Sequence, residues 1–130
     1  MPAPTILVAD DDRVTLGLLS AGLRHAGYQV QTALDAMQVV MAAHRHRPDA
    51  IVLDILMPGG GGLVALKELK AATSTCLIPV IAISVSQDPT IPARAVAEGA
   101  AAFLPKPVQI ADLGDLLIHL LGPRNAPTGE

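Results

Sequence analysis

Aromatic side chains are almost absent from this sequence, which has one Tyr, one Phe and no Trp in 130 residues. A folded core must therefore be built from aliphatic side chains. The scarcity of rings that could stack on an isoalloxazine also argues against a protein that binds FMN. The hydrophobic share of 51% is nevertheless high enough for a packed core, and it excludes disorder over most of the chain.

Other absences narrow the location and the partners. A single cysteine, Cys76, cannot form an internal disulfide, which fits a reducing cytoplasm. The first residues, Met-Pro-Ala-Pro, lack the regions of a secretory signal, and no apolar run reaches the roughly 18 residues that a membrane-spanning helix needs. The net charge of −3 offers no basic excess for direct binding to DNA or RNA. We therefore expect a cytoplasmic protein with no membrane contact and no direct nucleic-acid contact.

A chain of this length is expected to form one domain, and its apolar patterns predict five strand–helix units. Strands are expected at 6–9, 29–33, 50–53, 80–83 and 102–104. The first helix is expected to be capped by Asp11 or Asp12 and to end at Gly27. The other helices are expected at 35–45, from about Gly62, at 91–98 and at 110–121.

The character of the strands predicts how they are arranged. The first, third and fourth are continuous apolar runs, which is typical of interior parallel strands, whereas the second alternates as an edge strand does. This pattern indicates an α/β fold, a flavodoxin-like (βα)5 three-layer sandwich with a five-stranded parallel sheet in the order 2-1-3-4-5. The domain is expected to span 1–122, with 123–130 as a flexible C-terminal tail or linker stub.

Polar residues stand at the ends of four of these apolar runs. Asp10 and Asp11 follow the first run, Asp54 the third and Ser84 the fourth, and Lys106 comes shortly after the fifth. The pocket of an open parallel sheet lies outside the carboxyl ends of its strands, so these side chains should meet there. Three carboxylates, a hydroxyl and an ammonium can hold a divalent cation and accept a phosphoryl group on a carboxylate.

The segments ILVADDD, IVLDILMPGGGGL, VIAISVS and AAFLPKPV carry these residues, separated by 43, 30 and 22 positions from Asp11 through Asp54 and Ser84 to Lys106. In these motifs the chain resembles a response-regulator receiver domain of bacterial two-component signalling, similar to the chemotaxis regulators. The resemblance covers about residues 5–121. It implies a signalling domain that takes a phosphoryl group from a sensor histidine kinase or a histidine phosphotransfer protein. It would not be an enzyme beyond its own Mg²⁺-dependent phosphorylation and dephosphorylation.

The resemblance also implies roles for individual residues. Asp54 would be the phospho-acceptor, Ser84 would hydrogen-bond the phosphoryl oxygens and Lys106 would neutralise their charge. The ligands of Mg²⁺ (or Mn²⁺), three carboxylates and one backbone carbonyl, would be Asp10, Asp11, Asp54 and Leu56. Asp11 would coordinate directly, whereas Asp10 would lie near the metal or bind through water. No organic cofactor is expected.

Two further features follow from the resemblance alone. Ser84 and Phe103 would form a switch, in which the hydroxyl moves towards the phosphate and the ring rotates into the vacated space. The face made by the fourth helix, fifth strand and fifth helix would then change. Because the fifth helix carries Leu116, Ile118 and Leu121 beyond its inward stripe, this face could bury apolar area in a homodimer or against a partner. The Lys106–Pro107 peptide would be cis, a form that is readily available only before proline.

Some residues depart from the family pattern. Val85 stands where a small residue is common, and its branching is expected to narrow access to Asp54. The glycines at 59–62 predict a mobile loop, because glycine loses backbone entropy on ordering. Leu56 cannot orient an attacking water, so we predict a phosphorylated state that is not especially short-lived.

Two rival functions stay open. A degenerate receiver would recognise a partner without phosphorylation, and Val85 is its best support. A metal-dependent phosphohydrolase with an aspartate nucleophile usually has a second Asp two residues after the first, where this chain has Leu56. The sequence names neither the kinase nor the output.

Basic side chains outside the motifs are expected to be solvated. His44 and His46 are two positions apart and cannot share one face of a helix to bind a metal. Lys67 and Lys70 are likewise expected to face water.

Overall fold

Five parallel strands form the middle layer of the computed structural model, which describes residues 3–57 and 61–123. Within these residues the strands are β1 (Thr5–Ala9), β2 (Gln29–Ala33), β3 (Ala50–Asp54), β4 (Val80–Ser84) and β5 (Ala102–Pro105). Their order in the sheet is β2-β1-β3-β4-β5, as predicted. Every neighbouring pair is parallel, so all the carboxyl ends lie at one edge of the sheet.

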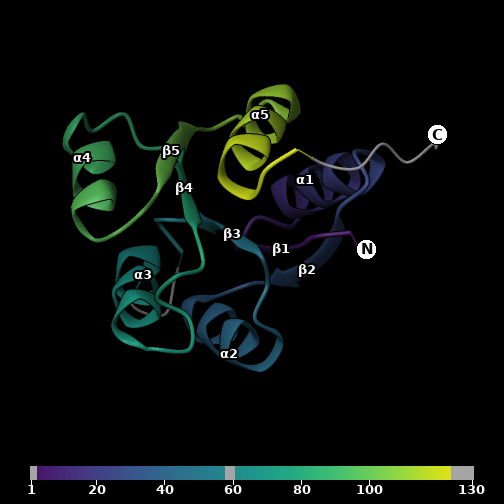
Figure 1. Cartoon of the computed structure of the whole chain (residues 1–130). Coiled ribbons are helices and arrows are strands. Elements are labelled where there is room, and N and C mark those ends of the chain that lie inside the picture. The colour runs from purple at the N-terminus through teal and green to yellow at the C-terminus, as the bar shows by residue number, and fades with distance from the viewer. Residues whose placement is uncertain (1–2, 58–60, 124–130) are drawn as a thin grey trace.

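Helices alternate with the strands and form the outer layers (Figure 1). They are α1 (Arg13–His25), α2 (Ala36–His46), α3 (Gly61–Ala71), α4 (Thr90–Ala97) and α5 (Ile110–Leu121). The first and last helices cover one face of the sheet, and α2, α3 and α4 cover the other (Figure 1). None of the described helices has the length and apolar character needed to cross a bilayer.

The start of α1 is determined by Asp12. Its Oδ1 accepts the N–H of Val14 at 3.0 Å, and its Oδ2 accepts the hydroxyl of Thr15 at 2.9 Å. An acceptor at this position satisfies a donor that the helix itself cannot use. Of the two caps predicted, Asp12 is therefore the one observed, and Asp11 is exposed at the rim of the sheet.

Two aliphatic clusters fill the space on either side of the sheet. The α2–α4 cluster includes Leu7, Ile51, Leu53, Val80 and Ala82 from the strands. The α1–α5 cluster includes Ile6, Val8, Val52, Ile81 and Ile83. Successive strand residues point to opposite faces. Strands buried on both faces must therefore be apolar throughout, which explains the continuous runs.

The prediction that Lys70 faces water is wrong. Its Nζ donates to the carbonyl oxygens of Cys76 at 3.0 Å and Ile78 at 2.7 Å, and burial lowers the pKa of this ammonium. The side chain thereby holds the segment that leads from α3 into β4. Lys67, by contrast, is exposed as expected.

The glycine-rich segment before α3 was predicted to be mobile, and its positions 59 and 60 lie outside the described residues. Gly61 and Gly62 belong to the first turn of α3, which was expected to begin at about Gly62, and the predicted mobility stays a prediction. The backbone of Gly61 has a φ of +80°, which favours glycine. The N–H of Gly62 donates to the carbonyl of Ile55 at 2.8 Å. The predicted C-terminal tail also lies outside the described residues, apart from Pro123.

Candidate functional site

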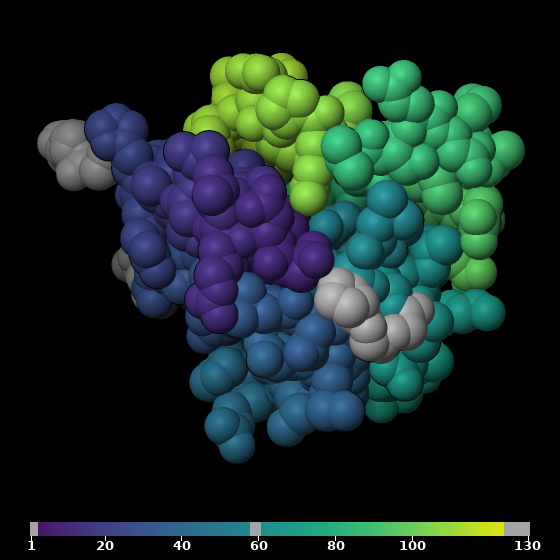
Figure 2. All heavy atoms as spheres, turned by 180° about the vertical axis from the view of Figure 1, so that it is seen from behind, coloured from purple at the N-terminus to yellow at the C-terminus, as the bar shows by residue number. Residues whose placement is uncertain are grey.

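The carboxyl ends of β1, β3, β4 and β5 meet at one edge of the sheet. Figure 2 shows segments that are far apart in the sequence (purple, teal, green and yellow-green) lying side by side on one face. An open cleft of about 480 Å³ lies here, with Asp11, Asp54 and Lys106 in its lining. Carboxylate oxygens of Asp10, Asp11 and Asp54 all lie within 4.8 Å of one another. The structure thus brings together acidic residues that are separated by more than forty positions in the chain.

Asp10 is fully buried, and both of its carboxylate oxygens are used. Oδ1 accepts the N–H of Asp12 at 2.9 Å. Oδ2 lies 2.7 Å from the Nζ of Lys106 in an ion pair. A buried carboxylate requires such partners, because an unpaired charge away from water is very costly. Asp10 therefore anchors the ammonium as well as contributing to the acidic group.

Asp54 is buried at the end of β3, with one carboxylate oxygen held on each side. Oδ1 accepts the N–H of Leu56 at 3.0 Å, and Oδ2 lies 3.2 Å from the Nζ of Lys106. Burial raises the pKa of Asp54, and the charge of Asp10 adds to this, against the lowering effects of the Leu56 N–H and of Lys106. The ionised form of Asp54 is therefore destabilised by burial, and a bound cation would stabilise it.

Lys106 completes the charge arrangement. Burial acts to lower the pKa of its ammonium, but the hydrogen bond to Asp10 and the charge of Asp54 outweigh this, so the pKa is raised. Its backbone N–H donates to the carbonyl of Ser84 at 2.9 Å, which links the ends of β4 and β5. The Lys106–Pro107 peptide is cis, which confirms the expectation from the family resemblance.

Ser84 is buried at the end of β4, and its Oγ accepts the N–H of Ser86 at 3.0 Å. No hydrogen bond joins this hydroxyl to Asp54 in the described part of the chain. Phe103 on β5 is paired with Ala82, which points to the same sheet face as Ser84. The partly buried Phe103 ring packs against the α2–α4 cluster. Ser84 and Phe103 thus lie on adjacent strands and on one face.

Two apolar side chains lie at the mouth of the cleft. Leu56 is 51% exposed and Val85 is 66% exposed, and both contribute to its lining. Val85 therefore lines the cleft, as its position after Ser84 suggested, but leaves it open. The exposure of Leu56 means that a substitution there would alter the rim without disturbing the core.

Sequence reasoning missed two contributions to this site. It did not anticipate that the strongest partner of Lys106 is Asp10, because a spacing of 96 positions gives no sign of pairing. It also missed Gly62, where a Cβ would collide with the carbonyl oxygen of Asp54. The only available signal was the run of glycines itself, which was interpreted as mobility.

The donor set is of the type that suits a small hard cation. Mg²⁺ prefers oxygen ligands and usually keeps several waters, so one or two carboxylates on an open cleft are enough. Asp11 is exposed at the rim and Asp54 is reached from the cleft, so both fit this requirement. The geometry can therefore hold a divalent cation beside a buried carboxylate and an ammonium.

Comparison with known families and curated proteins gives one consistent result. The family model for the response regulator receiver domain matches residues 6–118. The chain is 37% identical over 111 residues to the transcriptional regulatory protein PrrA of Mycobacterium tuberculosis, covering 85% of this chain and 47% of PrrA. It is also 37% identical over 103 residues to the response regulator PleD of Caulobacter vibrioides, covering 79% of this chain and 23% of PleD. The chain thus spans about half, or less, of the length of these relatives.

Solved structures agree with the fold. The receiver domain of a sensor histidine kinase from Pseudomonas aeruginosa, which has a magnesium ion coordinated in its active site cleft, superposes with a TM-score of 0.86 at 30% identity. That match covers 93% of this chain and 99% of the other. The chemotaxis protein CheY4 of Vibrio cholerae gives a TM-score of 0.84 at 26% identity, covering 91% and 98% of the two chains.

Proposed function

This chain belongs to the response regulator receiver domain family of two-component signalling, and from that premise we propose that Asp54 is its phospho-acceptor. The observation that carries the proposal is the position of the Asp54 carboxylate. It lies at the end of β3, 3.2 Å from the ammonium of Lys106 and within 4.8 Å of carboxylate oxygens of Asp10 and Asp11. The receiver domain is proposed to extend over 1–122 and to work in the cytoplasm.

The proposed donor is a phosphohistidine on a sensor histidine kinase or a histidine phosphotransfer protein. A carboxylate oxygen of Asp54 forms the new bond to phosphorus, and the bond from phosphorus to the imidazole nitrogen breaks. The imidazole leaves with the electron pair and takes up a proton from solvent. Such transfers depend mainly on positioning and on neutralising charge. Burial raises the pKa of the Asp54 carboxyl, which supports a need for positive charge beside a nucleophile at this position.

Asp11, Asp54 and the backbone carbonyl of Leu56 would hold Mg²⁺, with Asp10 beside it or joined to it through water; Mn²⁺ has the same ligand preference. When bound, the cation supplies charge neutralisation at the phosphoryl oxygens. Lys106 keeps a second positive charge on the other side of Asp54, and its ion pair with Asp10 sets the position of the ammonium. Together these groups would reduce the electrostatic repulsion between the Asp54 carboxylate and an incoming phosphoryl group.

Ser84 and Phe103 are proposed to transmit the change. The Ser84 Oγ already accepts a hydrogen bond from Ser86, so its own proton is available to donate to a phosphoryl oxygen. Phe103 follows on the same face of the neighbouring strand, and its ring is only partly buried. A shift of Ser84 would therefore alter the space beside this ring. The surface of α4, β5 and α5 stays a prediction for a homodimer, supported by Ile118, which is 46% exposed on α5.

The test is phosphorylation by acetyl phosphate with Mg²⁺, followed by intact mass spectrometry. The wild type should gain one phosphoryl group and Asp54→Asn none. Asp11→Asn should be phosphorylated more slowly and require more Mg²⁺, because the affinity of a carboxylate site depends on its ligand charge. Asp115→Asn, which changes an exposed acid on α5, is the matched control and should behave as the wild type.

Loss of the adduct in Asp54→Asn alone identifies the acceptor. If the wild type takes up no phosphoryl group, from acetyl phosphate or from a phosphorylated histidine protein, the degenerate receiver becomes the better description. An adduct that persists in Asp54→Asn would place the acceptor elsewhere.

A further inference from the structure

The outer edge of β2 carries backbone groups that no described residue binds. In the described sheet β2 pairs with β1 alone. The N–H of Gln29 donates to the carbonyl of Pro4 at 3.0 Å, and the carbonyl of Ala33 accepts from the residue that follows β1 at 3.1 Å. Bonds to one neighbour fall on alternate residues of a parallel strand. The N–H and C=O groups of Val30 and Thr32 therefore point to the outer side.

This edge lacks the features that usually prevent another strand from pairing. Natural edge strands are often protected by charged residues, proline or a bulge. The sequence of β2 is QVQTA, and its register with β1 is unbroken over five residues. The next outward donor, the N–H of Leu34, is bound by the Oε1 of Gln38 at 2.8 Å. The side chain of Gln38 thus closes one end of the edge and leaves Val30 and Thr32 open.

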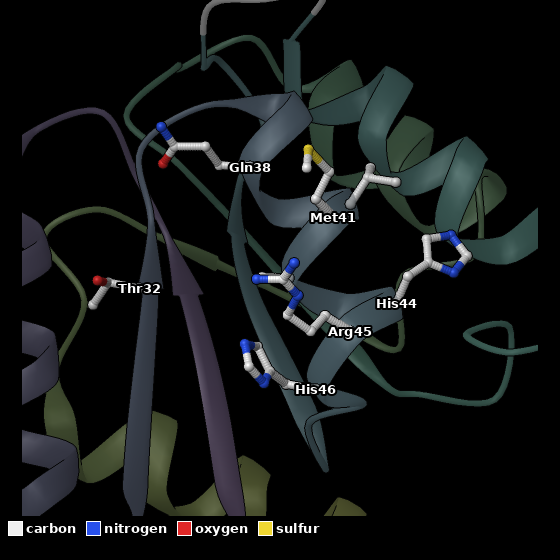
Figure 3. Close-up of a pocket in the computed structure, with 8 residues that line it drawn as sticks. Thr32, Gln38, Met41, His44, Arg45 and His46 are labelled. Atoms are coloured by element: carbon white, nitrogen blue, oxygen red, sulfur yellow. The ribbon is translucent and has the colours of Figure 1, made fainter.

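A groove of about 660 Å³ lies between this edge and α2. Its lining includes Thr32, Gln38, Arg45 and His46, and Figure 3 shows the last three projecting from α2 on the side of β2. His44 points to the other side of the helix (Figure 3), where its Nδ1 lies 2.9 Å from the hydroxyl of Ser74.

The charged side chain in the lining of the groove is the cation Arg45, although the chain as a whole carries a net charge of −3. The ionisable residues in its lining are His44, Arg45 and His46, and none of the lining residues is acidic. No ion pair joins Arg45 or His46 to a carboxylate within residues 3–57 and 61–123. Arg47, which follows α2, is also exposed. The basic side chains beside the open edge are therefore available to an acidic ligand.

We propose that the β2 edge and this groove bind an extended acidic segment of another protein. The segment would add a strand beside β2, exchanging backbone hydrogen bonds with Val30 and Thr32, while its carboxylates meet Arg45 and His46. Strand addition of this kind takes affinity from the main chain and specificity from side-chain contacts. A second copy of the chain, pairing through its own β2 edge, is the alternative occupant, and the hydrogen-exchange experiment below distinguishes it.

The first experiment measures binding of a fluorescein-labelled peptide in which Glu alternates with Val, by fluorescence anisotropy at low salt. A peptide in which Lys replaces Glu is the charge control. We expect the Glu peptide alone to bind, and Arg45→Glu to weaken its binding roughly fivefold to tenfold by replacing an attraction with a repulsion. Arg24→Glu, an exposed residue of α1 on the other face of the sheet, should leave the affinity unchanged.

The second experiment uses amide hydrogen exchange and does not depend on any variant. On addition of the Glu peptide, exchange should slow at Val30 and Thr32, whose N–H groups are open. Exchange at Leu34 should change much less, because its N–H is already bound by Gln38. Asp54→Asn should bind the peptide as the wild type does, so this inference and the proposed acceptor can fail separately.

Several results would overturn the inference. These are no binding of the Glu peptide, equal binding of the Lys peptide, or an affinity that Arg24→Glu lowers as much as Arg45→Glu. Protection of Val30 and Thr32 that rises with protein concentration in the absence of peptide would instead assign the edge to a second copy of the chain.

Discussion

The ammonium of Lys106 lies closer to Asp10 than to Asp54: its Nζ is 2.7 Å from the Oδ2 of Asp10 and 3.2 Å from the Oδ2 of Asp54. Asp10 has no exposed surface, so it depends on this ion pair for compensation of its charge. Asp54 shares the same ammonium and also faces the cleft. Lys106 thus holds two carboxylates together, and its loss affects both.

We predict that Lys106→Met lowers the free energy of unfolding at neutral pH by about 3 kcal/mol, because it leaves a buried carboxylate unpaired. Asp10→Asn/Lys106→Met should lose less than the sum of the two single variants, with a coupling energy of roughly 1–3 kcal/mol. Urea denaturation without Mg²⁺ measures all four proteins. Additive effects would mean that the pair contributes nothing of its own.

Asp54→Asn should stabilise the protein at neutral pH in the absence of Mg²⁺. Burial raises the pKa of Asp54 above its ordinary value of 3.8, so the folded state binds its proton more readily than the unfolded state. The ionised carboxylate therefore lowers stability above its native pKa, and removing it should raise the free energy of unfolding by about 1 kcal/mol.

The advantage of Asp54→Asn should shrink as the pH falls through the native pKa of Asp54 towards 3.8, since the wild type then becomes neutral there. Denaturation at several pH values tests this, with Asp115→Asn as the control for an exposed acid. If the stability gained by Asp54→Asn increased as the pH fell, the pKa of Asp54 would be lowered in the folded state, which would contradict the prediction.

Gly62→Ala should be strongly destabilising. A Cβ there would collide with the carbonyl oxygen of Asp54 and lie 2.6 Å from the Cα of Ile55, so β3 and α3 would have to separate. We expect a loss of about 2–4 kcal/mol and slower phosphorylation of Asp54. Gly114→Ala on α5 is the matched control, because nothing lies within 4 Å of its Cβ. That change should stabilise the helix by about 0.5–1 kcal/mol. Similar effects at both positions would refute the steric explanation.

Leu56→Asn should shorten the lifetime of the phosphorylated state. Leu56 lies at the mouth of the cleft, and an amide there can orient an attacking water that leucine cannot. We expect loss of phosphate to be roughly tenfold faster, a typical gain from positioning a reactant. Decay of the phosphorylated protein, followed by mass spectrometry, gives the rate. Leu77→Asn changes a residue that is 91% exposed at the opposite end of β4, and should have no effect. Unchanged or slower decay in Leu56→Asn would count against the idea.

Much of the fold could be predicted from the sequence, because local patterns determine it. Continuous apolar runs gave the interior strands and alternation gave the edge strand, each to within one residue. Asp10, Asp54 and Ser84 stand at the ends of predicted strands. Because the carboxyl ends of parallel strands lie at one edge of the sheet, their meeting at that edge could be predicted. The helix at 110–121 was predicted with its observed bounds from its apolar periodicity alone.

The errors concern contacts between distant segments. A lysine at an outward helical position normally reaches water, but Lys70 instead meets carbonyl groups of the chain as it turns back towards β4. Gly61 has a positive φ, and Gly62 lies close to the backbone of Asp54 and Ile55. Neither requirement can be inferred from the amino-acid composition of the segment. The pairing of Lys106 with Asp10 likewise exists only once the sheet is assembled.

The sheet also separates two residues that are neighbours in the chain, Phe103 and Leu104. Phe103 packs against the α2–α4 cluster and Leu104 against the α1–α5 cluster. The sheet lies between these two clusters, so a rotation of the Phe103 ring would change the packing of the α2–α4 cluster only. Any mechanical signal that begins at Phe103 should therefore reach α4 first, and α5 only through the chain that connects β5 to it.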